Sequence, residues 1–201
     1  IQNLRRNGAV IIGKSNMTEF ANYVSTKMPG GYSSRGGQVI HAVKSGLDPL
    51  GSSTGSAVAV AAGIVPMAVG TDTSHSITAC AMGNGICGLK PPAGVLSQEG
   101  IIPISKTFDS AGAMAQNVSD TLKLYSAMRD EPLPEITQTP AGKLRISVNI
   151  ANADMNPQER RKYLDGVIET LRNNGVVISE VNQPPTPELP SIMKREFGTG
   201  L

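Results

Sequence analysis

Aromatic residues and cysteines are scarce in this sequence. Aromatic side chains make up 3% of the 201 residues, tryptophan is absent, and Cys80 and Cys87 are the two cysteines. So few cysteines exclude the dense disulfide framework of a small secreted domain and favour reduced thiols in a cytoplasmic protein. Glycine occurs 22 times, and with so few aromatic rings this favours a tightly turned α/β protein packed through small side chains.

Strong charge and long apolar runs are also missing. The net charge is +2, so nothing indicates a nucleic-acid partner or an anionic membrane surface. No apolar run approaches the roughly 20 residues that a membrane span needs, and no charged-then-apolar signal peptide opens the chain. We therefore expect neither nucleic acid nor membrane as a partner. The length has room for one ordinary domain with a real core.

Apolar patterning and turn residues predict strands that alternate with helices. This alternation is typical of a mostly parallel sheet covered by helices on both faces. The expected strands are 9–12 (buried), 65–69, 87–89, 144–148 and 176–181. The expected helices are 1–7, 18–24, 54–62, 77–82, 117–128 and 157–173.

Two serine-rich loops carry most of the chemistry in the sequence. The first is Gly51–Ser56 and the second is Gly70–Ile77, with a helix of small residues and a short strand between them. Such loops can face each other across one site, which suits acyl transfer: one hydroxyl attacks, another relays its proton, and backbone N–H groups hold the oxyanion. The first loop lacks the Gly-Lys-Ser/Thr ending of a phosphate-binding loop, which argues against a nucleotide site.

The pair of loops closely resembles the amidase signature family of serine hydrolases. Further motifs at the family's spacing extend the resemblance to about Met128. In chain order the matching segments are Gly8–Phe20, Gly31–Gln38, Gly51–Gly63, Gly70–Ile77, Gly88–Pro92, Gly100–Ser105 and Asp109–Gly112.

The resemblance implies the amidase-signature fold, with a mixed, mostly parallel sheet flanked by helices. Proteins of this family are about twice as long, so we expect the chain to be a single domain that is incomplete at both ends. Within it, residues 1–130 would form the signature core, residues 131–142 a proline-rich connector, and residues 143–201 a further strand–helix–strand part.

Ser76 is the nucleophile that the resemblance implies. It precedes a predicted helix, whose N-terminal N–H groups favour a developing oxyanion. Ser52 matches the family's bridging serine, which has a cis peptide bond and passes the proton. Ser53 and Ser56 are expected to be hydrogen-bonding residues of the loop.

The oxyanion hole is implied to be the backbone of Thr73, Ser74, His75 and Ser76. His75 stands where the family usually has glycine, which allows close approach at no steric cost. An alternative makes His75 the base of a Ser-His-Asp triad with Asp72, but adjacent side chains on a tight loop rarely reach each other.

The family's base is a lysine that lies upstream of the Gly-Lys-Ser-Asn stretch, outside residues 1–201. Lys14 matches a different lysine of the family, so we do not assign it that role. His41 is expected at the surface. Because the base is missing, we expect residues 1–201 by themselves to be inactive.

The expected function is hydrolysis of a non-peptide carboxylic amide to an acid and ammonia or an amine, through a Ser76 acyl-enzyme and a Ser-cisSer-Lys triad. The resemblance implies a small-molecule amide as partner, no cofactor and no metal, and it is compatible with a homodimer. Departures from the family pattern, such as Leu50 before the first loop, leave open an inactive remnant. A third interpretation is the glutaminase subunit of a tRNA-dependent amidotransferase.

Overall fold

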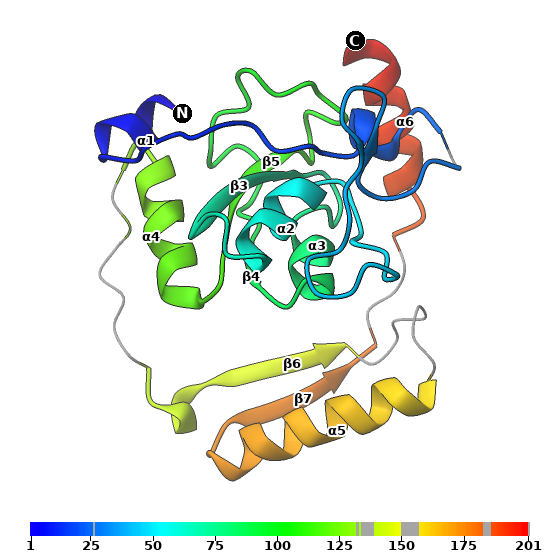
Figure 1. Cartoon of the computed structure of the whole chain (residues 1–201). Helices are drawn as coiled ribbons and strands as arrows, with labels where there is room; N and C mark the ends of the chain where they lie inside the picture. Colours follow the sequence, from blue (N-terminus) through cyan, green and yellow to red (C-terminus); the bar gives the residue numbers. More distant parts are fainter. Residues whose placement is uncertain (26, 132, 134–138, 150–156, 183–185, 201) are drawn as a thin grey trace. The chain divides into compact units, whose positions relative to one another are not determined.

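The computed structural model describes most of the chain (Figure 1). The described residues are 1–25, 27–131, 133, 139–149, 157–182 and 186–200. They divide into two compact units, of which the first combines residues 1–133 with 189–201 and the second is residues 134–188. Residues 189–201, at the end of the predicted strand–helix–strand part, belong to the first unit. The predicted connector at 131–142 lies partly outside the described residues.

A three-stranded sheet is the centre of the first unit. Its strands are β3 (Met67–Asp72), β5 (Ser110–Ala115) and β4 (Cys87–Leu89), in the order β3-β5-β4. Both pairings are antiparallel, and Asp72 at the end of β3 pairs with Ser110 at the start of β5. The sheet thus brings the second serine loop, which follows β3, next to the segment that leads into β5.

The mixed α/β class is confirmed, but the mostly parallel pairing expected for the sheet is wrong for the described strands. The chain passes from β4 to β5 through residues 90–109, which contain no helix. Parallel neighbours need a crossover connection, usually a helix, whereas an antiparallel neighbour does not. The parallel pair is β6 with β7 in the second unit, where a helix makes the crossover.

Helices cover both faces of the sheet. The side chains of β5 alternate: Met114 packs in one cluster with residues of α2 (Thr54–Ala61) and α3 (Thr78–Gly83). Ala111 and Ala113 pack in a second cluster with residues of α1 (Gln2–Arg6) and α4 (Val118–Met128). Successive residues of a strand point to opposite faces. Since both faces of the sheet are covered, β5 is buried along its whole length.

Close packing explains the small residues of β5. A Cβ on Gly112 would lie 2.2 Å from the carbonyl oxygen of Leu89 and 2.7 Å from Cδ1 of Ile77. The sequence did not predict this strand, because it contains none of the β-branched or aromatic residues that favour strands. Its small side chains are what allow β4, α3 and β5 to approach one another.

Residues 9–12 do not form the expected buried strand. Val10 and Ile12 are 85% and 72% exposed, and the segment belongs to no strand of the described structure. An apolar run favours an extended segment, but a strand also needs a neighbour that pairs with its backbone.

The remaining elements of the first unit are short, except for the last helix. The expected helix at 18–24 is a 3-10 turn, η1 (Glu19–Asn22), and a small hairpin follows it with β1 (Tyr32–Ser33) and β2 (Gly37–Gln38). The last helix, α6 (Leu189–Gly200), returns to this unit.

The second unit pairs β6 (Arg145–Asn149) with β7 (Val177–Val181) in parallel, joined by α5 (Pro157–Asn173). A 3-10 turn, η2 (Ala141–Lys143), precedes β6. The expected helix at 157–173 is confirmed, and the two strands agree with prediction to within one residue at each end. Across the described residues of both units, none of the helices has the length and apolar character that crossing a membrane would require.

Candidate active site

Hydrogen bonds from the start of α2 hold the two serine loops together. The Ser53 N–H donates to the Ser76 carbonyl at 3.4 Å. The Ser53 hydroxyl donates to the Thr71 carbonyl at 2.8 Å and accepts from the Thr71 N–H at 3.0 Å. Ser56 Oγ donates to the Val69 carbonyl at 2.8 Å. The prediction that Ser53 and Ser56 are hydrogen-bonding residues of the loop is confirmed, and both hydroxyls have partners on the backbone of β3.

Ser52 has a buried and unpartnered hydroxyl. Ser52 is 2% exposed, and its Oγ has no hydrogen-bond partner within the described part of the chain. The Gly51–Ser52 peptide bond is cis, as the resemblance implied, and the Ser52 carbonyl accepts from the Thr18 N–H at 3.0 Å. A buried hydroxyl without a partner is costly, so this oxygen is a candidate for contact with a reacting group.

Ser76 lies just before α3, partly buried, with its carbonyl bound to Ser53. Among the described residues, no acceptor takes a hydrogen bond from the N–H groups of Thr73, Ser74, His75 or Ser76. Unpaired N–H groups gathered on one short loop before a helix can bind negative charge. Free backbone donors of this kind are one requirement of an oxyanion hole.

Asp72 closes the second serine loop. Its side chain is fully buried, and Oδ2 accepts from the Ile77 N–H at 2.7 Å and, more weakly, from the Thr78 N–H at 3.4 Å. Oδ1 lies 3.2 Å from Lys90 Nζ in an ion pair, although it has no well-aligned hydrogen bond. Lys90 Nζ also donates to the Thr73 carbonyl at 3.0 Å. The carboxylate and the ammonium together hold both ends of the loop.

Asp109 joins the second serine loop to the segment before β5. Its Oδ1 accepts from the Thr73 hydroxyl at 2.6 Å, while Oδ2 accepts from the N–H groups of Ile104 at 2.8 Å and Ser105 at 3.1 Å. The roles of Asp72, Lys90 and Asp109 in the loop's geometry were not predicted from the sequence. The sequence did contain a signal for each residue. Asp72 and Asp109 are acidic residues at or next to strand ends, and Lys90 lies within the Gly88–Pro92 motif.

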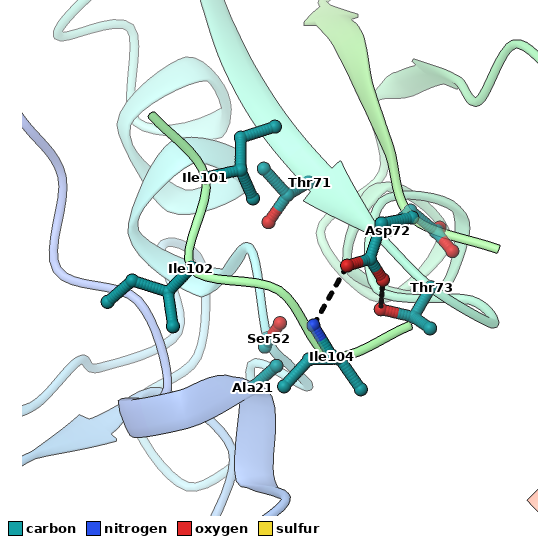
Figure 2. A pocket seen from close by; sticks show the side chains of 9 residues that line it. Ala21, Ser52, Thr71, Asp72, Thr73, Ile101, Ile102 and Ile104 are labelled. Carbon is teal, nitrogen blue, oxygen red and sulfur yellow. Dashed lines mark hydrogen bonds between the residues drawn. The ribbon is translucent and has the colours of Figure 1, made fainter. Parts of the chain in front are cut away.

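A pocket opens beside these loops. Figure 2 shows Ser52 and Thr73 facing it, with Ile101 and Ile102 on the segment that closes one side. Its lining combines hydroxyl and carboxylate groups with aliphatic side chains: Ala21, Ser52, Thr71, Asp72, Thr73, Ile101, Ile102, Ile104 and Asp109. The lining is about as polar as it is apolar, and convergent hydroxyl and carboxylate groups of this kind can orient a bound small molecule.

His75 and Asp72 do not pair, in agreement with the argument against a triad made from the sequence. His75 is exposed, its Nδ1 lies 2.8 Å from Ser74 Oγ, and the Asp72 carboxylate is bound elsewhere. The structure therefore offers no support for a His75–Asp72 pair.

The surface position expected for His41 is wrong. The residue is 7% exposed, Nε2 donates to the Gly83 carbonyl at 2.9 Å, and Nδ1 accepts from the N–H groups of Val43 and Lys44. The carbonyl can only accept and the amides can only donate, so these bonds select the tautomer protonated at Nε2. The ring lies between the segment after β2 and the end of α3 and forms hydrogen bonds with both, which accounts for its burial.

Lys14 is exposed, and the described residues contain no group of three or more histidine, cysteine, aspartate or glutamate side chains suited to a metal ion.

Comparisons with known proteins match nearly the whole chain. The Amidase family model matches residues 1–197. A probable amidase of Arabidopsis thaliana is 34% identical over 203 residues, covering 96% of this chain and 39% of the plant protein. A glutamyl-tRNA(Gln) amidotransferase subunit of Sulfurisphaera tokodaii is 34% identical over 194 residues, covering 90% of this chain and 40% of the archaeal protein.

A solved structure agrees with the fold. The native peptide amidase of Stenotrophomonas maltophilia superposes with a TM-score of 0.84 at 33% identity, over 99% of this chain and 45% of that one. The chain spans less than half the length of these relatives. On the family model and these relatives together, the chain belongs to the amidase signature family.

Proposed function

We propose that the complete enzyme hydrolyses a small, non-peptide carboxylic amide to a carboxylic acid and ammonia or an amine. The observation that carries this proposal is the buried, unpartnered hydroxyl of Ser52, which faces a pocket beside a loop of unpaired N–H groups. No metal or cofactor enters the proposal, because a serine nucleophile and a base suffice for acyl transfer.

In the proposed reaction, Ser76 Oγ attacks the amide carbon and its proton passes to Ser52. Ser52 in turn hands a proton to a lysine base, which the family resemblance places outside residues 1–201. The carbonyl oxygen becomes an oxyanion held by N–H groups of residues 73–76. The C–N bond then breaks as the leaving nitrogen takes the proton. Water attacks the resulting ester and releases the acid.

The loop contacts support this assignment. The Ser53–Ser76 hydrogen bond keeps the loop that carries Ser52 next to the loop that carries Ser76. Asp72 and Lys90 fix the second loop from both ends. Pre-organised donors stabilise charge as it develops, because the site need not reorganise during the reaction.

The experiment is active-site labelling with kinetics in the complete enzyme. A fluorophosphonate should label Ser76, Ser76→Ala should abolish labelling, and Ser52→Ala should slow it strongly. The matched control is Ser119→Ala, which removes an exposed hydroxyl from α4 and should change nothing. Labelling on Ser52 or Ser53 would overturn the assignment. A complete enzyme that hydrolyses no amide and takes no label would identify an inactive remnant.

A second candidate function is glutaminase activity in a tRNA-dependent amidotransferase. It is favoured by the 34% identity to the amidotransferase protein of Sulfurisphaera tokodaii. Release of ammonia from glutamine that rises when partner subunits are added would support it over the stand-alone amidase.

A further inference from the structure

The wall of the pocket comes from a segment with no regular secondary structure. This segment, residues 101–109, is called the isoleucine loop here, and it contributes Ile101, Ile102 and Ile104 to the lining. Ile102 is 62% exposed whereas Ile104 is 5% exposed. Ordering such a loop costs backbone entropy, so contacts from outside it must hold the wall in place.

A helix far along the chain supplies those contacts. The Glu196 carboxylate on α6 accepts hydrogen bonds from the Ser105 hydroxyl, from the Thr107 hydroxyl at 2.5 Å and from the Thr107 N–H at 3.1 Å. A carboxylate has room for about four hydrogen bonds, so most of its capacity is used on this one loop. Hydrogen bonds to an ionised acceptor are roughly twice as strong as neutral ones.

The same helix also contacts the segment that carries Ala21, a further residue of the pocket lining. Phe197, the next residue on α6, meets Tyr23 edge-on with ring centroids 4.9 Å apart. Tyr23 follows η1, whose Ala21 lines the pocket. α6 therefore contacts both the isoleucine loop and the segment beside Ala21.

The hydrogen bonds continue from the loop into the catalytic machinery. Ser105 donates its hydroxyl to Glu196 and its N–H to Asp109. Asp109 accepts in turn from the hydroxyl of Thr73, within the second serine loop. Displacement of Ser105 would disturb the pocket wall first and the serine loop second.

We propose that Glu196 is a positioning residue of the substrate pocket, which holds the isoleucine loop in its wall-forming conformation from α6. The kinetic part of this proposal rests on the proposed amidase function, whereas its structural part does not. Consistent with the geometry, the hydrogen bond from the Ser105 side chain, then those from Thr107, and the nearby Lys106 charge lower the pKa of Glu196 below its ordinary value. The carboxylate thus stays ionised, and the contact stays intact, throughout the neutral range.

The structural test is amide hydrogen exchange followed by mass spectrometry on Glu196→Gln. Glu188→Gln is the control, because it makes the same chemical change on an exposed residue just before α6. In Glu196→Gln, amides of residues 101–109 should exchange about tenfold faster, because charge-assisted hydrogen bonds are lost. Those of β5 should not change. Unchanged exchange in the loop, or an equal increase throughout the first unit, would overturn the proposal.

The kinetic test uses the complete enzyme. Glu196→Gln should raise KM about tenfold and leave kcat within about twofold, because the pocket wall binds the substrate without touching the reacting bond. Ser105→Ala should have a similar effect, and combining the two substitutions should add little. A fall in kcat at constant KM would overturn the positioning role. If Ser76→Ala left hydrolysis intact, the proposed function would fail, but the exchange result would still decide the role of Glu196.

Discussion

Single residues in or beside the two serine loops determine the geometry of the site. Asp72 ends β3 and bonds forward to the start of α3, while Leu50, just before the first serine loop, has a φ of 60°. Glycine adopts this left-handed region at no cost, whereas leucine does not. The Leu50 side chain packs against the buried cluster that contains Ile77 and Met114, and this contact offsets part of the backbone cost.

Asp72→Asn tests the buried carboxylate. The change removes the charge opposite Lys90 and replaces an acceptor by a donor, so the free energy of unfolding should fall by about 2 kcal/mol, less than for a fully buried pair because Lys90 is partly solvated. The control is Asp120→Asn, which breaks an exposed pair with Lys123 and should have a much smaller effect. Equal losses in urea unfolding of the two variants would show that Asp72 does not hold the loop.

His75→Gly tests whether the imidazole takes part in chemistry. His75 is exposed and does not have a positive φ, so its backbone needs no glycine and its side chain points to no catalytic partner found among the described residues. In the complete enzyme the substitution should leave kcat unchanged or raise it, since the N–H donor remains. A hundredfold fall in kcat would mean that histidine is a catalytic group after all.

Cys80 should be chemically inert. Burial, followed by the repulsion of Asp72 and Asp48, raises the pKa of its thiol to about 12. The reactive thiolate is therefore rare at pH 8, well below that pKa. Iodoacetamide at pH 8, read out by mass spectrometry of the folded protein, should modify the partly exposed Cys87 and spare Cys80. Modification of both cysteines at similar rates would contradict this.

At the scale of elements, the sheet depends on small residues more than on strand-forming ones. β5 is buried on both faces and pairs with β3 and β4, yet all its residues but Met114 are small. Helix α2 approaches β3 through serine side chains that bond to the strand's backbone. Substitutions that add side-chain volume here should therefore lower the free energy of unfolding more than substitutions that remove volume.

Gly112→Ala tests this packing. The added Cβ would meet the backbone oxygen of Leu89 at 2.2 Å, so the free energy of unfolding should fall by about 3 kcal/mol. The control is Gly166→Ala on α5, where a Cβ meets nothing within 4 Å, and where alanine should add about 0.5 kcal/mol of helix stability. Urea unfolding measures both, and a tolerated Gly112→Ala would mean that β4 can move away from β5.

At the scale of the whole molecule, the chain holds two serine loops and a pocket but spans less than half of its relatives. The base lysine that the resemblance implies is not among its matched residues. General-base catalysis contributes roughly 10²–10⁴-fold in rate, so the loss of the base alone would lower activity by that factor. The pocket itself is lined by residues of the first unit alone.

A polypeptide of residues 1–201 should therefore release no measurable ammonia from simple aliphatic or aromatic amides or from glutamine. A coupled ammonia assay on the purified polypeptide checks this, with a longer polypeptide that supplies the lysine as the positive control. Turnover by residues 1–201 alone, if abolished by Ser76→Ala, would mean that a group inside the chain acts as the base.

The sequence by itself determined the family, the two serine loops and most of the helices. Motif order, helix periodicity and capping residues are local signals. Asn117 is an example of a capping residue, since its side chain accepts from the Asp120 N–H at the start of α4. Helix α5 was predicted at its observed bounds for the same reason.

Only the tertiary structure decided which residues hold the two serine loops together. Strand β5 carries no local strand signal, and it forms because β3 and β4 pair with its backbone on both sides. The contacts of Asp72 with Lys90 and of Glu196 with Ser105 join residues that are distant in the chain. No pattern of neighbouring residues encodes such contacts, because they exist only once the sheet has brought the segments together.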